Sequence, residues 1–290
     1  MDKNLMKLLK EFLYHLEFDI KKKENTIISI KNDLLHFIEF FNENLNLEDQ
    51  PHLLFNNYVK DLESLGFKTV TINRKISSLK SFFKFLYKNG YIENNLYLYF
   101  KRKNYDIYNP DFFTFEEIDN IRNSIQGNNF KFFRDKLIFE LMYSSGITPH
   151  DLLSLSEYNF DINNRKILIL KNKNKIELYF SNRTVEAFEE YFKIRNQKFY
   201  GEYNKNYIFT NNSNEKLTDR SLRRIFDRYF KKAGINREVS LYTFRHTFCI
   251  HMLSKGFEKE YLKELLSIKN NNILNIYEKI SKEVDRCQKN

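Results

Sequence analysis

Residues that bend or cross-link a chain are scarce in this sequence. Its 290 residues include 7 Gly, 3 Pro, 2 Cys and no Trp. So few helix breakers favour a largely helical protein over a turn-rich β-protein. The two cysteines, Cys249 and Cys287, form no Cys-x-x-Cys motif and no Cys/His cluster, which argues against a structural zinc site. We therefore expect no bound metal.

Long apolar runs are absent as well. No segment is apolar over the roughly 20 residues that a membrane-spanning helix needs. The start of the chain, Met1–Leu5, lacks the apolar stretch of a secretory signal. The sequence thus predicts a cytoplasmic protein without a membrane partner.

Positive charge, in contrast, is in excess. Lys and Arg total 48 against 38 Asp and Glu, which gives a net charge of +10 and an isoelectric point near 9.2. A basic excess of this size favours a polyanionic partner, usually nucleic acid or an anionic membrane face.

The first ninety residues carry apolar side chains at helical spacing in four segments. In the fourth, Thr69–Tyr87, the apolar face includes Ile72 and Ile76. The polar side is assigned four lysines: Lys75, Lys80, Lys84 and Lys88. A linker is predicted next, with the basic cluster Lys101-Arg102-Lys103. We therefore divide the chain into a helical domain at 1–93, a linker at 94–112 and a second domain at 113–290.

In the second domain, the spacing of apolar residues changes once, from a helical to an alternating pattern. A capping-box pattern at Thr114 and Glu117 starts a helical region. Residues 166–170 and 176–180 then read as two strands joined by the Lys-rich turn 171–175. The pattern predicts an α-rich domain with one small antiparallel hairpin. A later helix, preceded by Thr218 as its cap, bears a basic face made of Arg220, Arg223 and Arg224.

The most informative string is Tyr242-Thr243-Phe244-Arg245-His246-Thr247-Phe248, followed by His251-Met252-Leu253. It resembles the box His-x-Leu-Arg-His-Thr-Phe-Ala-x-His-Leu-Leu of the tyrosine recombinases, the phage integrase family. Three more segments resemble the family's core-binding helix, first box and closing box, in that order: Thr71–Leu86, Arg134–Leu155 and Leu265–Tyr277. The resemblance covers nearly the whole chain and favours an Xer-like member.

The resemblance implies a fold and a partner. Such proteins join an N-terminal helical core-binding domain of the SAM-like type to an α-rich catalytic domain with a small antiparallel sheet. The two close round double-stranded DNA as a C-shaped clamp, and four subunits, identical or different, assemble on paired sites. We expect the phosphate and groove contacts to come from Lys75, Lys80, Lys101, Arg102, Arg220, Arg223 and Arg224.

The resemblance also implies a chemistry. A Tyr hydroxyl attacks a DNA phosphodiester, forms a 3′-phosphotyrosyl link and releases a 5′-hydroxyl. Because the bond energy is retained, no cofactor, ATP or metal is needed. Two Arg side chains stabilise charge on the non-bridging oxygens, a hairpin Lys protonates the leaving oxygen, and His residues assist proton transfer.

When the family's catalytic roles are carried over position by position, Tyr277 matches the nucleophile and Arg245 matches the second Arg. His246 matches a His with a supporting role. The hairpin Lys is Lys171, Lys173 or Lys175. We prefer Lys173, because the turn differs by one residue from the family pattern.

Three positions depart from the family pattern. Thr148 stands where the first Arg is expected, and Ile268 stands where His or Trp is usual. Tyr242 replaces a His or Lys, and we keep it in the site because its hydroxyl can donate a hydrogen bond. Removing one preorganised donor typically costs about 10²–10³ in rate.

Two functions therefore compete. A site-specific recombinase, slowed by its incomplete site, is favoured by Tyr277 and Arg245. A catalytically impaired homologue that acts as an accessory or regulatory DNA-binding factor is favoured by Thr148 and Ile268. A helical RNA-binding protein has only composition in its support.

Overall fold

The computed structural model describes residues 2–43, 51–103, 109–171, 174–200, 202, 206–268 and 271–289. For residues 2–4, 43, 51 and 286–289 it describes the backbone only. The chain forms two compact units, Met1–Tyr108 and Asn109–Asn290. In the described ranges, no helix is both long and apolar enough to cross a membrane.

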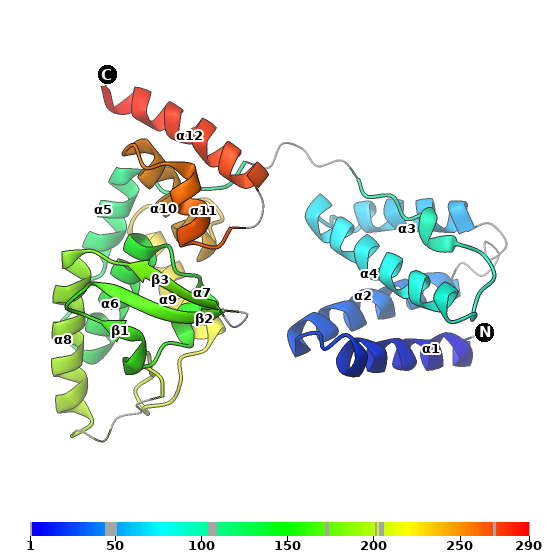
Figure 1. Cartoon of the computed structure of the whole chain (residues 1–290), viewed down its shortest axis with the longest axis horizontal. Coiled ribbons are helices and arrows are strands. Elements are labelled where there is room, and N and C mark those ends of the chain that lie inside the picture. The colour runs from blue at the N-terminus through cyan, green and yellow to red at the C-terminus, as the bar shows by residue number, and fades with distance from the viewer. Residues whose placement is uncertain are drawn as a thin grey trace. The chain divides into compact units, whose positions relative to one another are not determined.

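The first unit is helical, as predicted. It contains α1 (Asp2–Tyr14), extended by a π-helical turn η1 (His15–Asp19), then α2 (Glu24–Glu43), α3 (Pro51–Ser64) and α4 (Thr69–Lys88) (Figure 1). Apolar side chains at helical spacing meet in one core, which includes Leu9, Phe12, Leu34, Tyr58, Leu62, Ile76 and Leu79.

The segment after α4 packs on this unit. A short 3₁₀ helix, η3 (Leu96–Leu98), contacts α4, and Phe100 is buried against Phe55 and Phe83 with ring centroids 4.9 and 5.0 Å away. The amide of Asn73 bonds both backbone polar groups of Lys103, at 2.9 and 3.0 Å. Residues 96–103, which the sequence analysis assigns to the linker, are thus held against α4.

The placement of Lys75 differs from the expectation. Its side chain is buried, with the ammonium 3.7 Å from the Asp33 carboxylate and over the ring of Phe67. Burial lowers the pKa of Lys75, while Asp33 opposes this shift. Spacing alone put Lys75 on the polar face of its helix, but the carboxylate on α2 draws it inside. We therefore correct the assignment: Lys75 forms an interior ion pair and is not a surface contact for DNA.

The second unit is α-rich, as predicted. Its helices are α5 (Phe115–Ser124), α6 (Phe130–Ser145), α7 (Pro149–Leu153), α8 (Asn182–Lys198), α9 (Asp219–Lys232), α10 (Tyr242–Ser254), α11 (Lys259–Leu265) and α12 (Asn271–Lys289). Both predicted caps are present: Thr114 and Glu117 form a full capping box, and Thr218 accepts the Ser221 N–H. Most residues of α6 are buried, and many of its apolar side chains belong to the core of this unit.

The predicted hairpin is confirmed, with longer strands. The strands β1 (Phe160–Asp161), β2 (Lys166–Lys171) and β3 (Asn174–Tyr179) form an antiparallel sheet in the order β1-β2-β3. Lys171 pairs with Asn174, so Lys171 and Lys175 lie on strands and not in a turn. Lys173 falls outside the described residues.

Gly146 is needed where α6 ends. Its φ of +61° lies in the left-handed region, and a Cβ added there would lie 2.6 Å from the Phe248 ring. Glycine alone satisfies both conditions without strain. This turn leads from the end of α6 into Thr148, the cap of α7.

We expect Gly146→Ala to lower the free energy of unfolding by about 2–3 kcal/mol, because strain at positive φ adds to overpacking against Phe248. The matched control is Gly256→Ala, where φ is +86° and nothing lies within 4 Å of the added Cβ. It should cost about 1 kcal/mol. Urea unfolding measures both, and equal losses would show that the Phe248 contact is unimportant.

Candidate active site

Arg245 lies in the first turn of α10 and joins the ends of two other helices. Its guanidinium donates to the carbonyl of Gly146 at 2.7 Å and to that of Leu266 at 2.8 Å. Gly146 follows α6, and Leu266 follows α11. A guanidinium has five N–H groups, so two carbonyls leave donors for an anion. Arg245 is thereby held in a fixed orientation.

Tyr277, on α12, lies against the residue that follows Arg245. Its hydroxyl is 2.6 Å from Nδ1 of His246, and the Tyr277 side chain is only 4% exposed. Burial, with a smaller contribution from Arg245, lowers the pKa of His246 to about 4. The imidazole is therefore neutral at pH 7. The packing of α10 on α12 thus unites Tyr277, His246 and Arg245, three residues assigned to the site from the sequence.

Thr148, at the position where an Arg was expected, is the N-cap residue of α7. Its hydroxyl accepts the Asp151 N–H at 3.1 Å and donates to the Asp151 carboxylate at 2.7 Å. Lys171 lies 3.4 Å from the same carboxylate, and His150 lies 3.6 Å from it. Although burial opposes ionisation, bonds from Thr148 and Lys171 lower the pKa of Asp151. Asp151 was not among the site residues expected from the sequence, although its place three residues after a capping Thr was a readable signal.

The described hairpin lysines lie in different surroundings. Lys171 contacts the Thr148–Asp151 pair. Lys175 lines a cleft that is also lined by Glu264 and Ser267, at the end of α11. Lys171 is thus the described hairpin lysine beside α7.

Tyr242 begins α10 and is 49% exposed. It shares a cleft of about 290 Å³ with Pro149 and with Arg223 of α9. Arg223 also pairs with Asp219 at 2.9 Å. A guanidinium therefore lines the same cleft as one substituted position, Tyr242, and as Pro149, which follows Thr148.

Ile268 lies in the turn that ends α11. The preceding residue, Ser267, has a φ of +51°, and the Ile268 N–H bonds the Lys263 carbonyl at 3.0 Å. This left-handed helix end suits glycine, but Ser267 occupies it here. The Ile268 side chain packs on the hydrophobic core.

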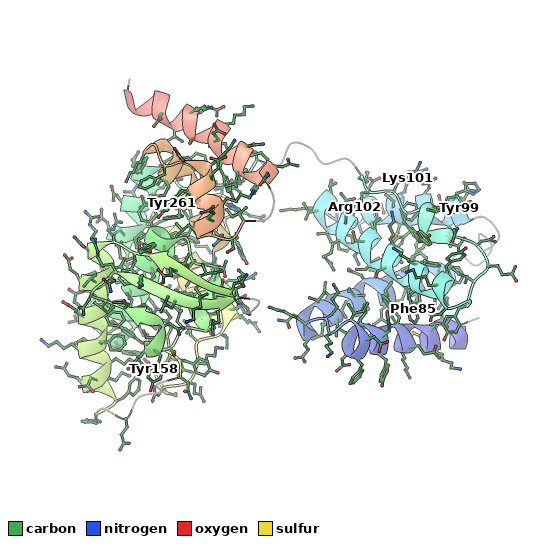
Figure 2. All side chains as sticks on the ribbon, in the orientation of Figure 1. Phe85, Tyr99, Lys101, Arg102, Tyr158 and Tyr261 are labelled. Carbon is green, nitrogen blue, oxygen red and sulfur yellow. The ribbon has the colours of Figure 1, made fainter. Side chains whose placement is uncertain are left out.

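A basic groove lies on the first unit. We use this name for the cleft of about 580 Å³ whose cations are Lys80, Lys84, Lys101 and Arg102. Arg102 donates to the Ser77 hydroxyl at 2.9 Å, and both Lys101 and Arg102 project from the segment after η3 (Figure 2). Lys84 was assigned to the polar side of its helix but not to the expected DNA contacts, although it lies one helical turn after Lys80.

A second basic surface is the polar face of α9. Arg220, Arg223 and Arg224 are exposed there, while Leu222 and Phe226 are buried on the opposite side. The arrangement agrees with the predicted amphipathic helix.

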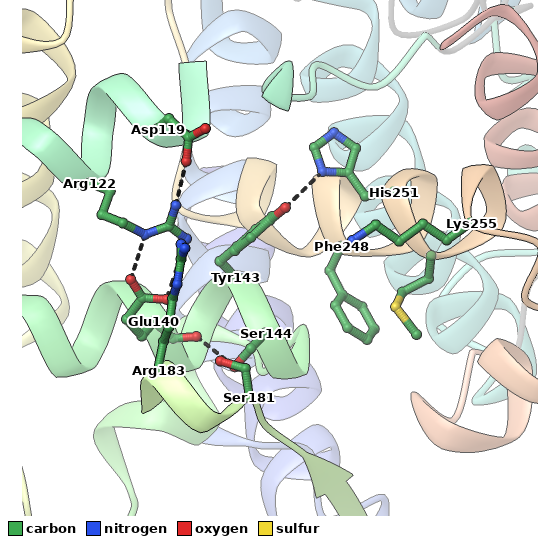
Figure 3. Close-up of a pocket in the computed structure, with 11 residues that line it drawn as sticks. Asp119, Arg122, Glu140, Tyr143, Ser144, Ser181, Arg183, Phe248, His251 and Lys255 are labelled. Carbon is green, nitrogen blue, oxygen red and sulfur yellow. Dashed lines mark hydrogen bonds and ion pairs between the residues drawn. The ribbon is translucent and has the colours of Figure 1, made fainter. Parts of the chain in front are cut away.

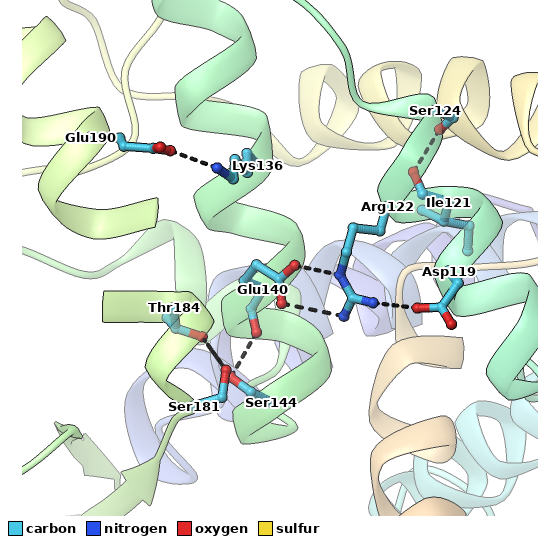
Figure 4. A network of polar contacts seen from close by, with 10 residues as sticks. All are labelled: Asp119, Ile121, Arg122, Ser124, Lys136, Glu140, Ser144, Ser181, Thr184 and Glu190. Carbon is cyan, nitrogen blue, oxygen red and sulfur yellow. Dashed lines mark hydrogen bonds and ion pairs between the residues drawn. The ribbon is translucent and has the colours of Figure 1, made fainter. Parts of the chain in front are cut away.

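Another pocket, of about 420 Å³, lies among α5, α6 and α10 (Figure 3). Arg122 is paired there with Glu140 at 2.7 Å and with Asp119 (Figure 4), and the Tyr143 hydroxyl lies 3.2 Å from His251. Several of its polar groups therefore pair with one another, although the buried Nε2 of His251 has no hydrogen-bond partner among the described residues. In the described residues, no three His, Cys, Asp or Glu side chains gather as metal ligands.

The fold and the site define a class of protein. It is a two-unit helical protein with a small antiparallel sheet, in which a tyrosine on α12 contacts the histidine that follows an arginine on α10. The chain belongs to the phage integrase family. The model of that family matches residues 111–283, and the model of the phage integrase N-terminal SAM-like domain matches residues 9–90.

The chain is also similar in sequence to known tyrosine recombinases. The chain is 28% identical over 266 residues to the tyrosine recombinase XerC of Staphylococcus carnosus, covering 90% of this chain and 88% of that protein. It is 28% identical to XerC of Listeria welshimeri, covering 96% and 94%.

Solved structures share the fold. XerH bound to palindromic difH substrate in a post-cleavage complex matches with a TM-score of 0.78 at 18% identity, covering 97% of this chain and 94% of that chain. A lambda integrase dimer bound to a core site matches with a TM-score of 0.72 at 16% identity, covering 94% of each.

Proposed function

We propose that this protein is a site-specific DNA recombinase that cleaves duplex DNA with Tyr277 as the nucleophile. The observation that carries the proposal is the contact of the Tyr277 hydroxyl with His246, next to Arg245, in a chain of the phage integrase family. Relatives of the same fold were solved bound to DNA, which supports a duplex partner.

In the proposed reaction, the Tyr277 oxygen attacks phosphorus and a 3′-phosphotyrosyl bond forms while the 5′-oxygen leaves. Arg245 stabilises charge on the non-bridging oxygens with the N–H groups that its two carbonyl bonds leave available. Lys171, the described hairpin lysine beside α7, protonates the leaving oxygen in place of our first preference, Lys173. Tyr242 remains a candidate hydrogen-bond donor to the phosphate.

We propose that DNA contacts come from the basic groove and from the α9 face. We keep the proposed division into a core-binding domain at 1–93, a linker at 94–112 and a catalytic domain at 113–290. We propose that the two domains close round duplex DNA, and that the protein acts in the cytoplasm as part of a tetramer. The packing of residues 96–103 on α4 adds Lys101 and Arg102 to the surface of the first unit.

A second candidate function is an accessory DNA-binding factor with an impaired site. It is favoured by Thr148, whose hydroxyl is committed to capping α7 and to Asp151, and by Ile268, whose side chain packs on the core. A suicide duplex, nicked next to the cleavage position and selected from a random pool by binding, separates the two functions. A recombinase leaves a covalent complex on a denaturing gel, and an accessory factor only shifts a native gel.

We expect duplex binding to weaken steeply with salt. With about six phosphate contacts at about −0.9 each, the log–log slope is near −5, and affinity falls about 10³-fold between roughly 50 and 200 mM salt. Fluorescence anisotropy with a labelled duplex measures this. A flat response would contradict the proposed basic surfaces.

We expect Arg220→Ala with Arg224→Ala to weaken binding and to make the salt slope shallower by about 1 per lost contact. Both side chains are exposed and make no ion pair with another described residue, so the melting temperature should hold. Lys193→Ala, an exposed cation on α8, is the control and should leave the slope unchanged. Normal binding by the double variant would remove α9 from the interface.

A further inference from the structure

We infer that His246 is the group that accepts the proton of Tyr277 when the tyrosine attacks DNA. This inference rests on the proposed function and assigns one more catalytic residue to it. The sequence analysis treated His246 as a supporting residue, whereas the structure places its ring nitrogen on the reacting hydroxyl.

The contact is short and enclosed. Nδ1 of His246 is 2.6 Å from the Tyr277 oxygen, and their ring centroids are 5.7 Å apart. The Tyr277 side chain is 4% exposed, so bulk water is poorly placed to take the proton. A proton acceptor has to lie within hydrogen-bond reach of the proton that it removes, and His246 meets this condition.

The charges around His246 favour a neutral acceptor before DNA binds. Burial and the Arg245 guanidinium both lower its pKa, and Asp111 raises it slightly. A phosphodiester that binds Arg245 adds a negative charge there and offsets the effect of the arginine. Substrate binding therefore strengthens His246 as a base at the moment when it is needed.

The proton balance of the step is complete. Tyr277 loses its hydroxyl proton to Nδ1 of His246 while its oxygen forms a bond to phosphorus. The bond from phosphorus to the 5′-oxygen breaks, and that oxygen receives a proton from Lys171. In the reverse step, the 5′-hydroxyl gives its proton to Lys171 and attacks the phosphotyrosyl phosphorus, while protonated His246 returns its proton to the departing Tyr277 oxygen.

The chain contains a matched control on the same helix. His251 of α10 is also buried, has a pKa lowered to about 4 chiefly by burial, and lies 3.2 Å from the hydroxyl of Tyr143. His251 and Tyr143 line the separate polar pocket and are not assigned to the cleavage site (Figure 3). Replacing either histidine by Asn keeps a hydrogen-bonding side chain but removes the base.

The test measures covalent adduct with the selected nicked duplex under single-turnover conditions. We expect His246→Asn to bind the duplex normally and to form adduct about 10²–10⁴-fold more slowly, and His251→Asn to match the wild type. Equal rates for His246→Asn and the wild type overturn the inference alone. A wild type that forms no Tyr277-dependent adduct overturns the proposed function itself.

Two further measurements separate proton transfer from a structural role. A fluorotyrosine at position 277 has a more acidic hydroxyl and needs less help from a base, so the His246→Asn defect should shrink at least tenfold. A defect of unchanged size overturns the inference. Independently of any DNA target and of the variants, ¹⁵N NMR of the wild-type protein at pH 7 should show Nδ1 of His246 unprotonated and Nε2 protonated. The opposite tautomer excludes Nδ1 as the acceptor.

Discussion

Tyr277→Phe is expected to abolish covalent adduct formation, by more than about 10⁴-fold, while duplex binding is retained. The change removes only the hydroxyl that contacts His246. The lost hydrogen bond should cost about 1 kcal/mol of stability. The measurement is a denaturing gel after incubation with the nicked duplex.

The control for this variant is Tyr143→Phe, which removes a hydroxyl from the other Tyr–His contact of α10, between Tyr143 and His251. It should form as much adduct as the wild type. Adduct that persists in Tyr277→Phe would show that another residue is the nucleophile.

Restoring the two lost side chains is expected to raise adduct formation. Thr148→Arg with Ile268→His should increase the rate by about 10²–10³-fold, because each adds a donor toward the phosphate. Thr148→Arg also removes the cap of α7, which should cost about 1 kcal/mol, partly offset by a new pair between the arginine and Asp151. Adduct rate and melting temperature are measured together.

The single variants show which loss matters. Ile268 packs on the core, so Ile268→His alone should destabilise the protein more than Thr148→Arg. A double variant that folds but cleaves no faster than the wild type would mean that existing cations already supply the missing charge. Arg223, in the cleft with Tyr242, and Lys171, at Asp151, are then the residues to replace.

Much of the fold follows from local patterns in the sequence. The helical periodicity of the first ninety residues, the caps at Thr114 and Thr218, and the alternation around 166–180 are short-range signals, and the structure confirms each. The order of the sequence boxes predicted the family, which the family model confirms. These features were readable because each depends on residues only a few positions apart.

Contacts between distant segments could not be read in this way. Lys75 matched a surface lysine in spacing, but a carboxylate on another helix, Asp33, holds it inside. Strand pairing places Lys171 on β2, within reach of Asp151, whereas Lys173, the hairpin lysine preferred from the sequence, lies outside the described residues. The contacts of Lys75 and Lys171 depend on which element packs beside which, and spacing along the chain carries no such information.

The sequence alone determined that this protein is a basic, helical member of the phage integrase family with Tyr277 and Arg245 in register with its boxes and Thr148 and Ile268 departing from them. Only the tertiary structure decided what those residues touch. Tyr277 meets His246 because α12 packs on α10, and Arg245 reaches the carbonyls of Gly146 and Leu266 because α6 and α11 end beside it. The physical reason is that the side chains of a site converge from separate elements, and packing of the core sets their distances.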